Sequence, residues 1–191
     1  MTPLVLYMSM SLDGFISGPD DQPGQELGRD GGRLFNWLDD RMSDGPSGQV
    51  FREAMATGAL ISGRRTFELA NRWRGDHHDG VPIFVLTRQA ADSAPPQWPL
   101  VSYVGDVGTA MAQAKQAAGD KNVLVHGAGT AQLALAAGVL DELEIHVIPV
   151  LLGQGRRLFD NLAPEHIELE RTRTLEGEAG VTHLHYRVQR A

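Results

Sequence analysis

The sequence contains no cysteine and comparatively few basic residues. Without cysteine, a disulfide framework, a zinc–thiolate site and a cysteine nucleophile are all excluded. Only 17 lysines and arginines stand against 24 aspartates and glutamates, which gives a formal net charge of -7. Broad adhesion to nucleic acid or to a membrane requires a basic face. We therefore expect neither as a partner, and any site for an anion must be local.

Long hydrophobic runs are also missing. No stretch approaches the roughly 18 apolar residues of a membrane-spanning helix, and the start of the chain, MTPLVLYMSMSLDGF, lacks the basic leader of a secretory signal. A cytoplasmic protein is expected. With 42% hydrophobic residues over 191 positions, the composition suits one domain, residues 1–191, with a full core.

Short apolar strands alternate with helices along most of the chain, which predicts an α/β fold with a largely parallel sheet covered by helices on both faces. The expected strands are residues 4–10, 59–62, 81–87, 100–104, 123–125 and 144–152. The expected helices are residues 33–41, 49–57, 66–73, 108–118 and 131–137. At the end of the chain, 167–174 and 181–188 alternate around the turn EGEAG, which predicts an antiparallel hairpin at a sheet edge.

The stretch 122–159 is the most informative, because it joins a buried strand, a glycine turn, a helix and a second strand without a break. The small residues 127–129 allow a phosphate to approach the backbone. Thr130 is expected to cap the following helix, with Leu133 and Leu135 turned inward. The first amides of that helix would be unpaired and would attract an anion. This order of elements predicts a dinucleotide-binding site.

Two further strand ends carry compatible chemistry: GRRT at 63–66 and TR at 87–88. The carboxyl ends of parallel strands lie along one edge of a sheet, so all three segments could address a single ligand. Guanidinium groups pair with phosphate oxygens, and a 2′-phosphate on the ribose would favour NADPH over NADH. Taken singly, GRRT could be a solvated helix start and GAG a simple turn. The fingerprint G-x-G-x-x-G with its later acidic residue is absent, which argues against a standard Rossmann site.

Four motifs carry a family resemblance: SLDGFISG (11–18), LISGRRTFE (60–68), FVLTR (84–88) and VHGAGTAQLALAAGVLDELEIHVIPVLLGQGRRLF (125–159). The chain resembles the dihydrofolate-reductase-like proteins, in particular the stand-alone relatives of the reductase domain of the bifunctional riboflavin-biosynthesis deaminase-reductase. The resemblance implies a mixed sheet flanked by helices, NADPH as cofactor, and hydride transfer to a small heterocyclic substrate, pterin-like or riboflavin-precursor-like. It also implies a homodimer. The zinc-containing deaminase domain has no counterpart here.

The resemblance assigns cofactor contacts residue by residue. GRRT is implied to bind the pyrophosphate and the 2′-phosphate, TR the ribose phosphate, and two N-terminal backbone positions the nicotinamide carboxamide. In the family, the paired small residues at 127–128 often lie across a cis peptide, although the second glycine is alanine here. The implied cofactor positions are Ser9, Ile16, Gly63, Arg64, Arg65, Thr66, Thr87, Arg88, His126, Gly127, Ala128, Gly129, Thr130 and Ala131.

The substrate side of the site has fewer signals. Dihydrofolate reductases place a carboxylate on the first helix, and the candidates for this catalytic role here are Asp39 and Asp40, although adjacent aspartates near a helix end are usually solvated. His126 could donate a proton near neutral pH, although a histidine at a strand end is commonly just hydrogen-bonded in place. Water is the remaining proton source. Arg156 and Arg157 are expected to be structural or to lie beside the substrate.

No metal site is expected from the histidines. His77, His78 and Asp79 have the composition of metal ligands but lie in a polar, glycine-flanked segment, so a surface loop is favoured. His183 and His185 share one face of the terminal hairpin, where a solvated or interface position is favoured. Two functions of different class remain: an NADPH-dependent reductase, and a nucleotide- or ligand-binding protein that keeps the fold without a productive substrate site.

Overall fold

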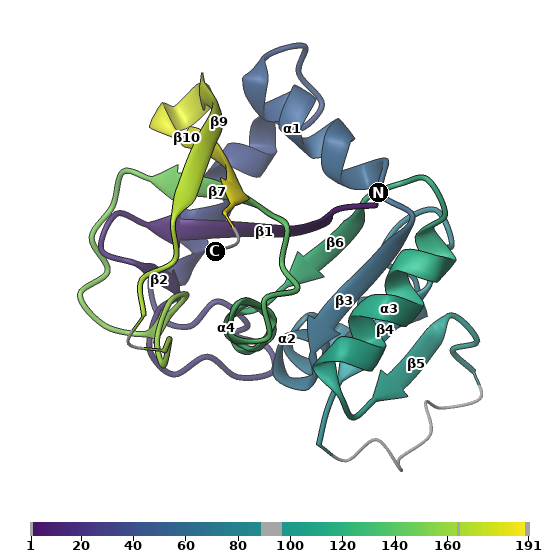
Figure 1. The fold of residues 1–191 in the computed structure, drawn as a ribbon. Helices are drawn as coiled ribbons and strands as arrows, with labels where there is room; N and C mark the ends of the chain where they lie inside the picture. Colours follow the sequence, from purple (N-terminus) through teal and green to yellow (C-terminus); the bar gives the residue numbers. More distant parts are fainter. Residues whose placement is uncertain (1, 89–96, 164, 190–191) are drawn as a thin grey trace.

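A computed structural model describes residues 2–88, 97–163 and 165–189 of the chain. An eight-stranded sheet crosses the molecule in the order β5-β4-β3-β6-β1-β7-β10-β9 (Figure 1). Its strands are β1 (Leu4–Ser11), β3 (Ala59–Gly63), β4 (Ile83–Leu86), β5 (Val101–Val104), β6 (Val123–His126), β7 (Glu142–Ile148), β9 (Leu169–Glu176) and β10 (Thr182–Val188). The first six in spatial order are parallel, and β10 pairs antiparallel with both β7 and β9. The predicted mixed, mostly parallel sheet with a terminal hairpin at its edge is confirmed.

Helices cover both faces of this sheet, as the alternating pattern predicted. Helices α3 (Val107–Ala118) and α4 (Ala128–Ala136) cover one face, and the 3-10 helix η1 (Gly31–Asp40), α1 (Pro46–Met55) and α2 (Arg64–Leu69) cover the other (Figure 1). The central strands are apolar on both faces because both are covered. Alanines make most of the buried surface of α3 and α4, so these helices lie close to the sheet.

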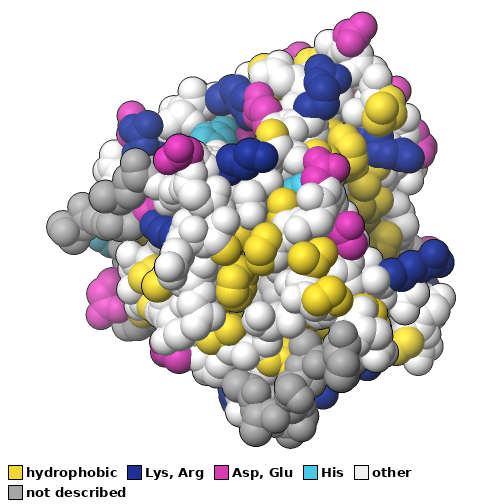
Figure 2. Space-filling model, turned by 90° about the vertical axis from the view of Figure 1, so that its right-hand side faces the viewer, with side chains coloured by type: hydrophobic (Ala, Val, Ile, Leu, Met, Phe, Trp, Pro, Cys, Tyr) yellow, Lys and Arg dark blue, Asp and Glu magenta, His cyan; other side chains and the backbone are white. Residues whose placement is uncertain are grey.

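Smaller elements complete the fold. Strands β2 (Phe15–Ser17) and β8 (Arg156–Arg157) pair as a two-stranded antiparallel sheet, and the 3-10 helices η2 (Asn71–Gly75) and η3 (Glu178–Gly180) follow α2 and β9. Among the described residues, no helix has the length and apolar character needed to cross a membrane. On the face drawn in Figure 2, basic and acidic side chains are interspersed.

The helix after β6 differs from the prediction. It begins at Ala128, not at residue 131, because Gly127 adopts φ +93° and turns the chain directly from strand into helix. Thr130 therefore lies inside the first turn and does not cap it. Residues two apart point to nearly opposite sides of a helix, so Leu133 and Leu135 cannot both face inward. The alanines face the core with Leu135 packed beside them, and Leu133 is 52% exposed.

Other predicted boundaries of helices and strands also differ from the observed ones. Helix α1 begins at Pro46, three residues before the predicted start, because proline suits the first helical turn. Helix α2 ends at Leu69 and not at residue 73, since residues 71–74 all adopt positive φ. The predicted helix 33–41 is a 3-10 helix that begins at Gly31. The strand expected at 144–152 runs instead over Glu142–Ile148.

Candidate functional site

A cavity of about 1100 Å³ opens where the carboxyl ends of β1, β3, β4 and β6 meet. Its volume slightly exceeds the range of about 300–1,000 Å³ usual for small-molecule sites, so it has room for a large cofactor together with a small substrate. The structure brings the three predicted strand ends together around it. Predicted cofactor positions that line the cavity are Ser9, Ile16, Gly63, Arg64, Arg65, Thr66, Thr87, Arg88, His126, Ala128, Gly129 and Thr130. Gly127 and Ala131 are buried just behind it.

Two helix starts form the floor of the cavity, one after β3 and one after β6. They approach each other so closely that a Cβ added to Gly127 would collide with the Thr66 hydroxyl, and one added to Gly63 would lie 3.1 Å from the Thr130 Oγ1. Both N-termini therefore present backbone amides to the same space, which favours an anion. The peptide bond from Gly127 to Ala128, a cis candidate by resemblance, is trans.

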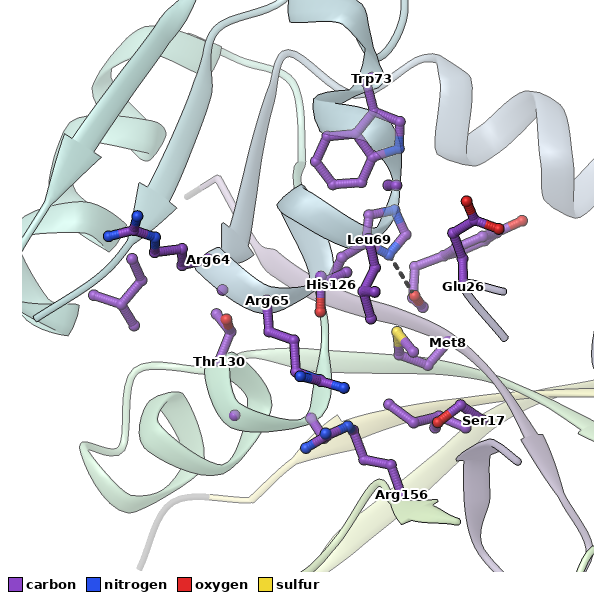
Figure 3. Close-up of a pocket in the computed structure, with 18 of the residues that line it drawn as sticks. Met8, Ser17, Glu26, Arg64, Arg65, Leu69, Trp73, His126, Thr130 and Arg156 are labelled. Atoms are coloured by element: carbon purple, nitrogen blue, oxygen red, sulfur yellow. Dashed lines mark hydrogen bonds between the residues drawn. The ribbon is translucent and has the colours of Figure 1, made fainter. Parts of the chain in front are cut away.

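Arg65 and Arg156 approach each other across this polar end of the cavity, as Figure 3 shows. Between them lies Asp21, whose Oδ1 accepts a hydrogen bond of 2.6 Å from Arg65 and whose Oδ2 lies 3.4 Å from Arg156 Nε. Burial raises the pKa of Asp21, but the hydrogen bond from Arg65 and the charge of Arg156 outweigh it and lower the pKa overall. The carboxylate thus occupies the position where these two cations could bind an anionic ligand.

The remaining arginines differ in their surroundings. In Figure 3 the Arg64 side chain points away from that of Arg65, and its Nε donates a 2.8 Å hydrogen bond to Glu68 within α2. Arg88 is exposed at the end of β4. Arg157 lies outside the lining of this cavity, and its guanidinium lies over Phe15, 4.4 Å from the ring centroid. Arg156, by contrast, belongs to the lining.

Aromatic and imidazole rings line the opposite end of the cavity. The Nδ1 of His126 lies 2.9 Å from the backbone oxygen of Tyr7, and because a carbonyl only accepts, this nitrogen carries the proton and Nε2 is left as an acceptor. Burial lowers the pKa of His126 to about 4, so the ring is neutral at pH 7. In this geometry Nε2 of His126 is a hydrogen-bond acceptor. Trp73 stands beside it, with ring centroids 6.1 Å apart.

His77, expected on a surface loop, lies instead in the cavity wall. Its ring centroid is 5.4 Å from that of His126, and burial lowers its pKa to about 3. His78 faces away from the lining toward Thr57, with 3.2 Å between His78 Nε2 and Thr57 Oγ1, while Asp79 is exposed. The sequence missed this arrangement because the positive-φ residues of η2 fold the segment back onto the end of β6.

Neither Asp39 nor Asp40 lines the cavity, although the neighbouring Trp37 and Leu38 do. The carboxylates in the lining are Asp21, Glu26 and Asp106. In Figure 3, Glu26 stands at the side of the cavity that also holds Met8 and His126. Asp106 is used as the N-cap of α3, where it accepts a 2.7 Å hydrogen bond from the Thr109 amide. Glu26 and Asp21 lie in a loop with several acidic residues and no distinguishing spacing, so nothing in the sequence singled them out.

Comparisons with known proteins identify the family of the chain and relatives of its fold. The family model described as the RibD C-terminal domain matches residues 3–182. A protein of Shewanella sp. PV-4 assigned to riboflavin biosynthesis has a similar structure, with TM-score 0.75 and 22% identity over 99% of this chain and 100% of that one. No match was found among curated protein sequences.

Two further structures extend the likeness of fold. RibD of Acinetobacter baumannii aligns with TM-score 0.66 and 16% identity over 100% of this chain, which spans 59% of that longer protein. Dihydrofolate reductase of Enterococcus faecalis, solved with NADP(H) and RAB-propyl, aligns with TM-score 0.61 and 16% identity over 98% of this chain and 97% of that one. The fold is therefore dihydrofolate-reductase-like.

Proposed function

The chain belongs to the RibD C-terminal domain family, and we propose that it is an NADPH-dependent reductase that transfers a hydride to a small heterocycle, pterin-like or riboflavin-precursor-like. One observation carries the proposal: three strand ends far apart in the sequence meet around a single cavity that has two helix starts and two arginines at one end and aromatic rings at the other. A phosphorylated dinucleotide and a planar substrate need these two environments side by side.

Each end of the cavity has a distinct task in this proposal. Arg65 and Arg156, with the amides of both helix starts, bind the pyrophosphate, and Thr87 with Arg88 binds the 2′-phosphate. The bound cofactor supplies the hydride. Trp73 offers a flat surface to the heterocycle, and this chain's contribution is chiefly orientation.

Proton delivery is proposed to come from the open side of the cavity. His126 Nε2 can accept a hydrogen bond from a ring N–H of the substrate and so fix its orientation. Asp39 and Asp40 lie outside the lining, which leaves water at the cavity mouth as the proton source, with Glu26 as the carboxylate placed to orient it.

Cofactor titration tests the proposal directly. We expect NADPH to change its fluorescence on binding, and to bind more tightly than NADH because only NADPH carries the 2′-phosphate. Arg65→Ala should weaken NADPH binding about 10- to 100-fold, the loss of one charge-assisted pair. Arg41→Ala is the matched control, because Arg41 donates to a carbonyl of its own helix and lies outside the lining. Equal affinity of the two variants would contradict the assignment.

A binding protein without catalysis is the second candidate, favoured by the absence of both η1 aspartates from the lining. Turnover separates the two functions. A reductase should oxidise NADPH when offered pterins or ribosylaminopyrimidines, and loss of absorbance at the nicotinamide band measures this oxidation. A binding protein should bind NADPH and leave it unoxidised with each of these compounds. A protein that neither binds nor oxidises NADPH contradicts both.

A cytoplasmic homodimer is the proposed state of the protein. In the described part of the chain, β9 is an edge strand with a neighbour on one side only, so a symmetric partner could cover its free edge. Size-exclusion chromatography with light scattering tests this, and a monomer at micromolar concentration would contradict it.

A further inference from the structure

A second group of polar side chains lies outside the cavity, buried between the sheet and η1. Glu144 and His146 are two residues apart on β7 and so share a face, and His183 on β10 is the direct cross-strand partner of His146. Their exposed fractions are 4%, 0% and 1%. One ligand atom from each side chain lies within 4.8 Å of the others. Buried groups of this kind need partners.

We propose that Glu144, His146 and His183 bind one divalent transition-metal ion, of the Zn²⁺ or Fe²⁺ class. Two imidazole nitrogens and one carboxylate oxygen form a ligand set that these metals use with one or more positions open. Magnesium and calcium, which prefer sets made of oxygen, do not fit.

An unsatisfied carboxylate oxygen supports the site independently of the ligand pattern. Within the described residues, Glu144 Oε1 is buried without any hydrogen-bond partner. Buried polar atoms in native proteins are nearly always satisfied, and each exception calls for an explanation such as a missing ion. An ion beside Oε1 would give this buried oxygen a partner.

The two histidine rings face each other through their Nδ1 atoms, which lie 2.8 Å apart. Ligands of a tetrahedral ion at about 2.0–2.1 Å from each nitrogen lie roughly 3.3 Å from one another. The rings therefore need to separate by about half an ångström to admit an ion between these two atoms. A small rotation of either ring achieves this without any change in the register of β7 and β10.

Neighbouring groups hold the ligands in orientation. Arg173 donates a 3.0 Å hydrogen bond to Glu144 Oε2, which leaves Oε1 available. The Ser47 hydroxyl lies 3.2 Å from His183 Nε2, which fixes that ring with Nδ1 toward His146. Such contacts to the outer atoms of ligands are a regular feature of metal sites. The Tyr7 hydroxyl, which also lacks a partner among the described residues, is a further oxygen on this face for an open position.

The site lies behind the wall of the cofactor cavity. The ring of Trp37 is 4.5 Å from His146 and 5.0 Å from His183, and its Nε1 donates a 2.9 Å hydrogen bond to Ser9 Oγ. Trp37 and Ser9 line the cavity, whereas the three ligands do not. We assign the ion a structural role: it joins β7 to β10 beneath η1 and so fixes the substrate side of the cavity.

Metal content of the wild-type protein is the first test. The protein is made without a histidine tag, refolded in the presence of Zn²⁺ or Co²⁺ because the ligands are buried, and passed through a chelating column. We expect close to one ion per chain by mass spectrometry, a visible absorption band with Co²⁺, and a higher melting temperature than that of the protein refolded with chelator. X-ray absorption should show scattering from two imidazoles. Metal-free protein, or absorption without imidazole, overturns the proposal even if no variant folds.

Variants locate the ion. Glu144→Gln keeps the volume of the side chain and one acceptor oxygen. Glu144→Gln and His183→Ala, made separately, should each lower the affinity for Co²⁺ at least 100-fold. His166→Ala is the control, because the His166 side chain is 86% exposed and lies outside the cluster. His78→Ala tests the other close histidine pair, whose Nδ1 atoms with His77 are 2.7 Å apart. Loss of the Co²⁺ band in His78→Ala but not in His183→Ala overturns the assignment. Because NADPH binding is measured separately, failure here leaves the proposed reductase function unaffected.

Discussion

The cavity and the buried cluster around Glu144 both hold a carboxylate paired with arginine, yet they use these charges differently. In the cavity, Asp21 lies on a loop between Arg65 and Arg156, which we propose to bind an anionic ligand. In the cluster, Glu144 pairs with Arg173, and the Glu144 side chain is 5% exposed. In the proposed function, a ligand anion displaces Asp21 from its two arginines, whereas Glu144 and Arg173 stay paired as part of the fold.

Removing the arginine of the cluster should have the largest effect. Arg173 forms hydrogen bonds of 2.9 and 2.7 Å with both oxygens of Glu53 and one of 3.0 Å with Glu144. Arg173→Ala leaves Glu144 buried without its counter-ion, so we expect the free energy of unfolding to fall by about 3 kcal/mol. Urea denaturation in the presence of a chelator measures this without any contribution from a metal.

The control is a pair on the same hairpin. Arg187→Ala breaks a 2.9 Å contact with Glu170 in which both side chains are about half exposed, and it should cost no more than about 0.5 kcal/mol. Adding Glu144→Gln to Arg173→Ala should restore part of the loss, because the uncompensated charge is then removed. Equal effects of Arg173→Ala and Arg187→Ala would show that the buried ion pair contributes no more to the free energy of unfolding than the exposed one.

The turn at the floor of the cavity gives the next largest effect. Gly127 has φ +93°, and an added Cβ would meet the Thr66 hydroxyl, so Gly127→Ala should lower the free energy of unfolding by about 2 kcal/mol. Gly129→Ala, two residues later in helical conformation with open space around its Cβ, should be neutral or slightly stabilising. Thermal unfolding compares them. Equal losses would mean that the strain does not lie at residue 127.

The difference between the cavity and the cluster also marks the limit of what the sequence could predict. Periodicity predicts the mostly parallel sheet and the terminal hairpin. The position of each motif at a strand end predicts that GRRT, TR and GAGT meet. The cluster does not, because it forms through register. His146 and His183 are 37 positions apart and meet only through the antiparallel pairing of β7 and β10. Likewise, the place of His77 in the cavity wall depends on the positive φ angles of η2.

Acid should lower the free energy of unfolding through His126, the buried histidine of the cavity wall. The folded pKa of His126 is lowered to about 4, so the unfolded chain takes up a proton near pH 6.5 while the folded protein does not. Stability is therefore full above about pH 6.5 and declines as the pH falls toward 4. Between pH 7 and 5 the expected loss is up to about 2 kcal/mol. Urea denaturation of wild type and His126→Gln should show a shallower decline in the variant; parallel curves would contradict this.

The smallest predicted effect tests whether Asp21 is exchangeable. If an anion replaces it between Arg65 and Arg156, Asp21→Asn removes a competing charge and should tighten NADPH binding. We expect a gain of only about two- to five-fold, because both arginines are partly exposed and their ion pairs are partly screened by solvent. Asp20→Asn is the control: Asp20 pairs with Arg29, away from the large cavity. The effect should shrink as salt rises, since screening weakens both the carboxylate and the phosphate. Weaker binding in Asp21→Asn would instead mean that Asp21 holds the two arginines in place for the ligand, and that the cavity, like the cluster, commits this charge to its structure.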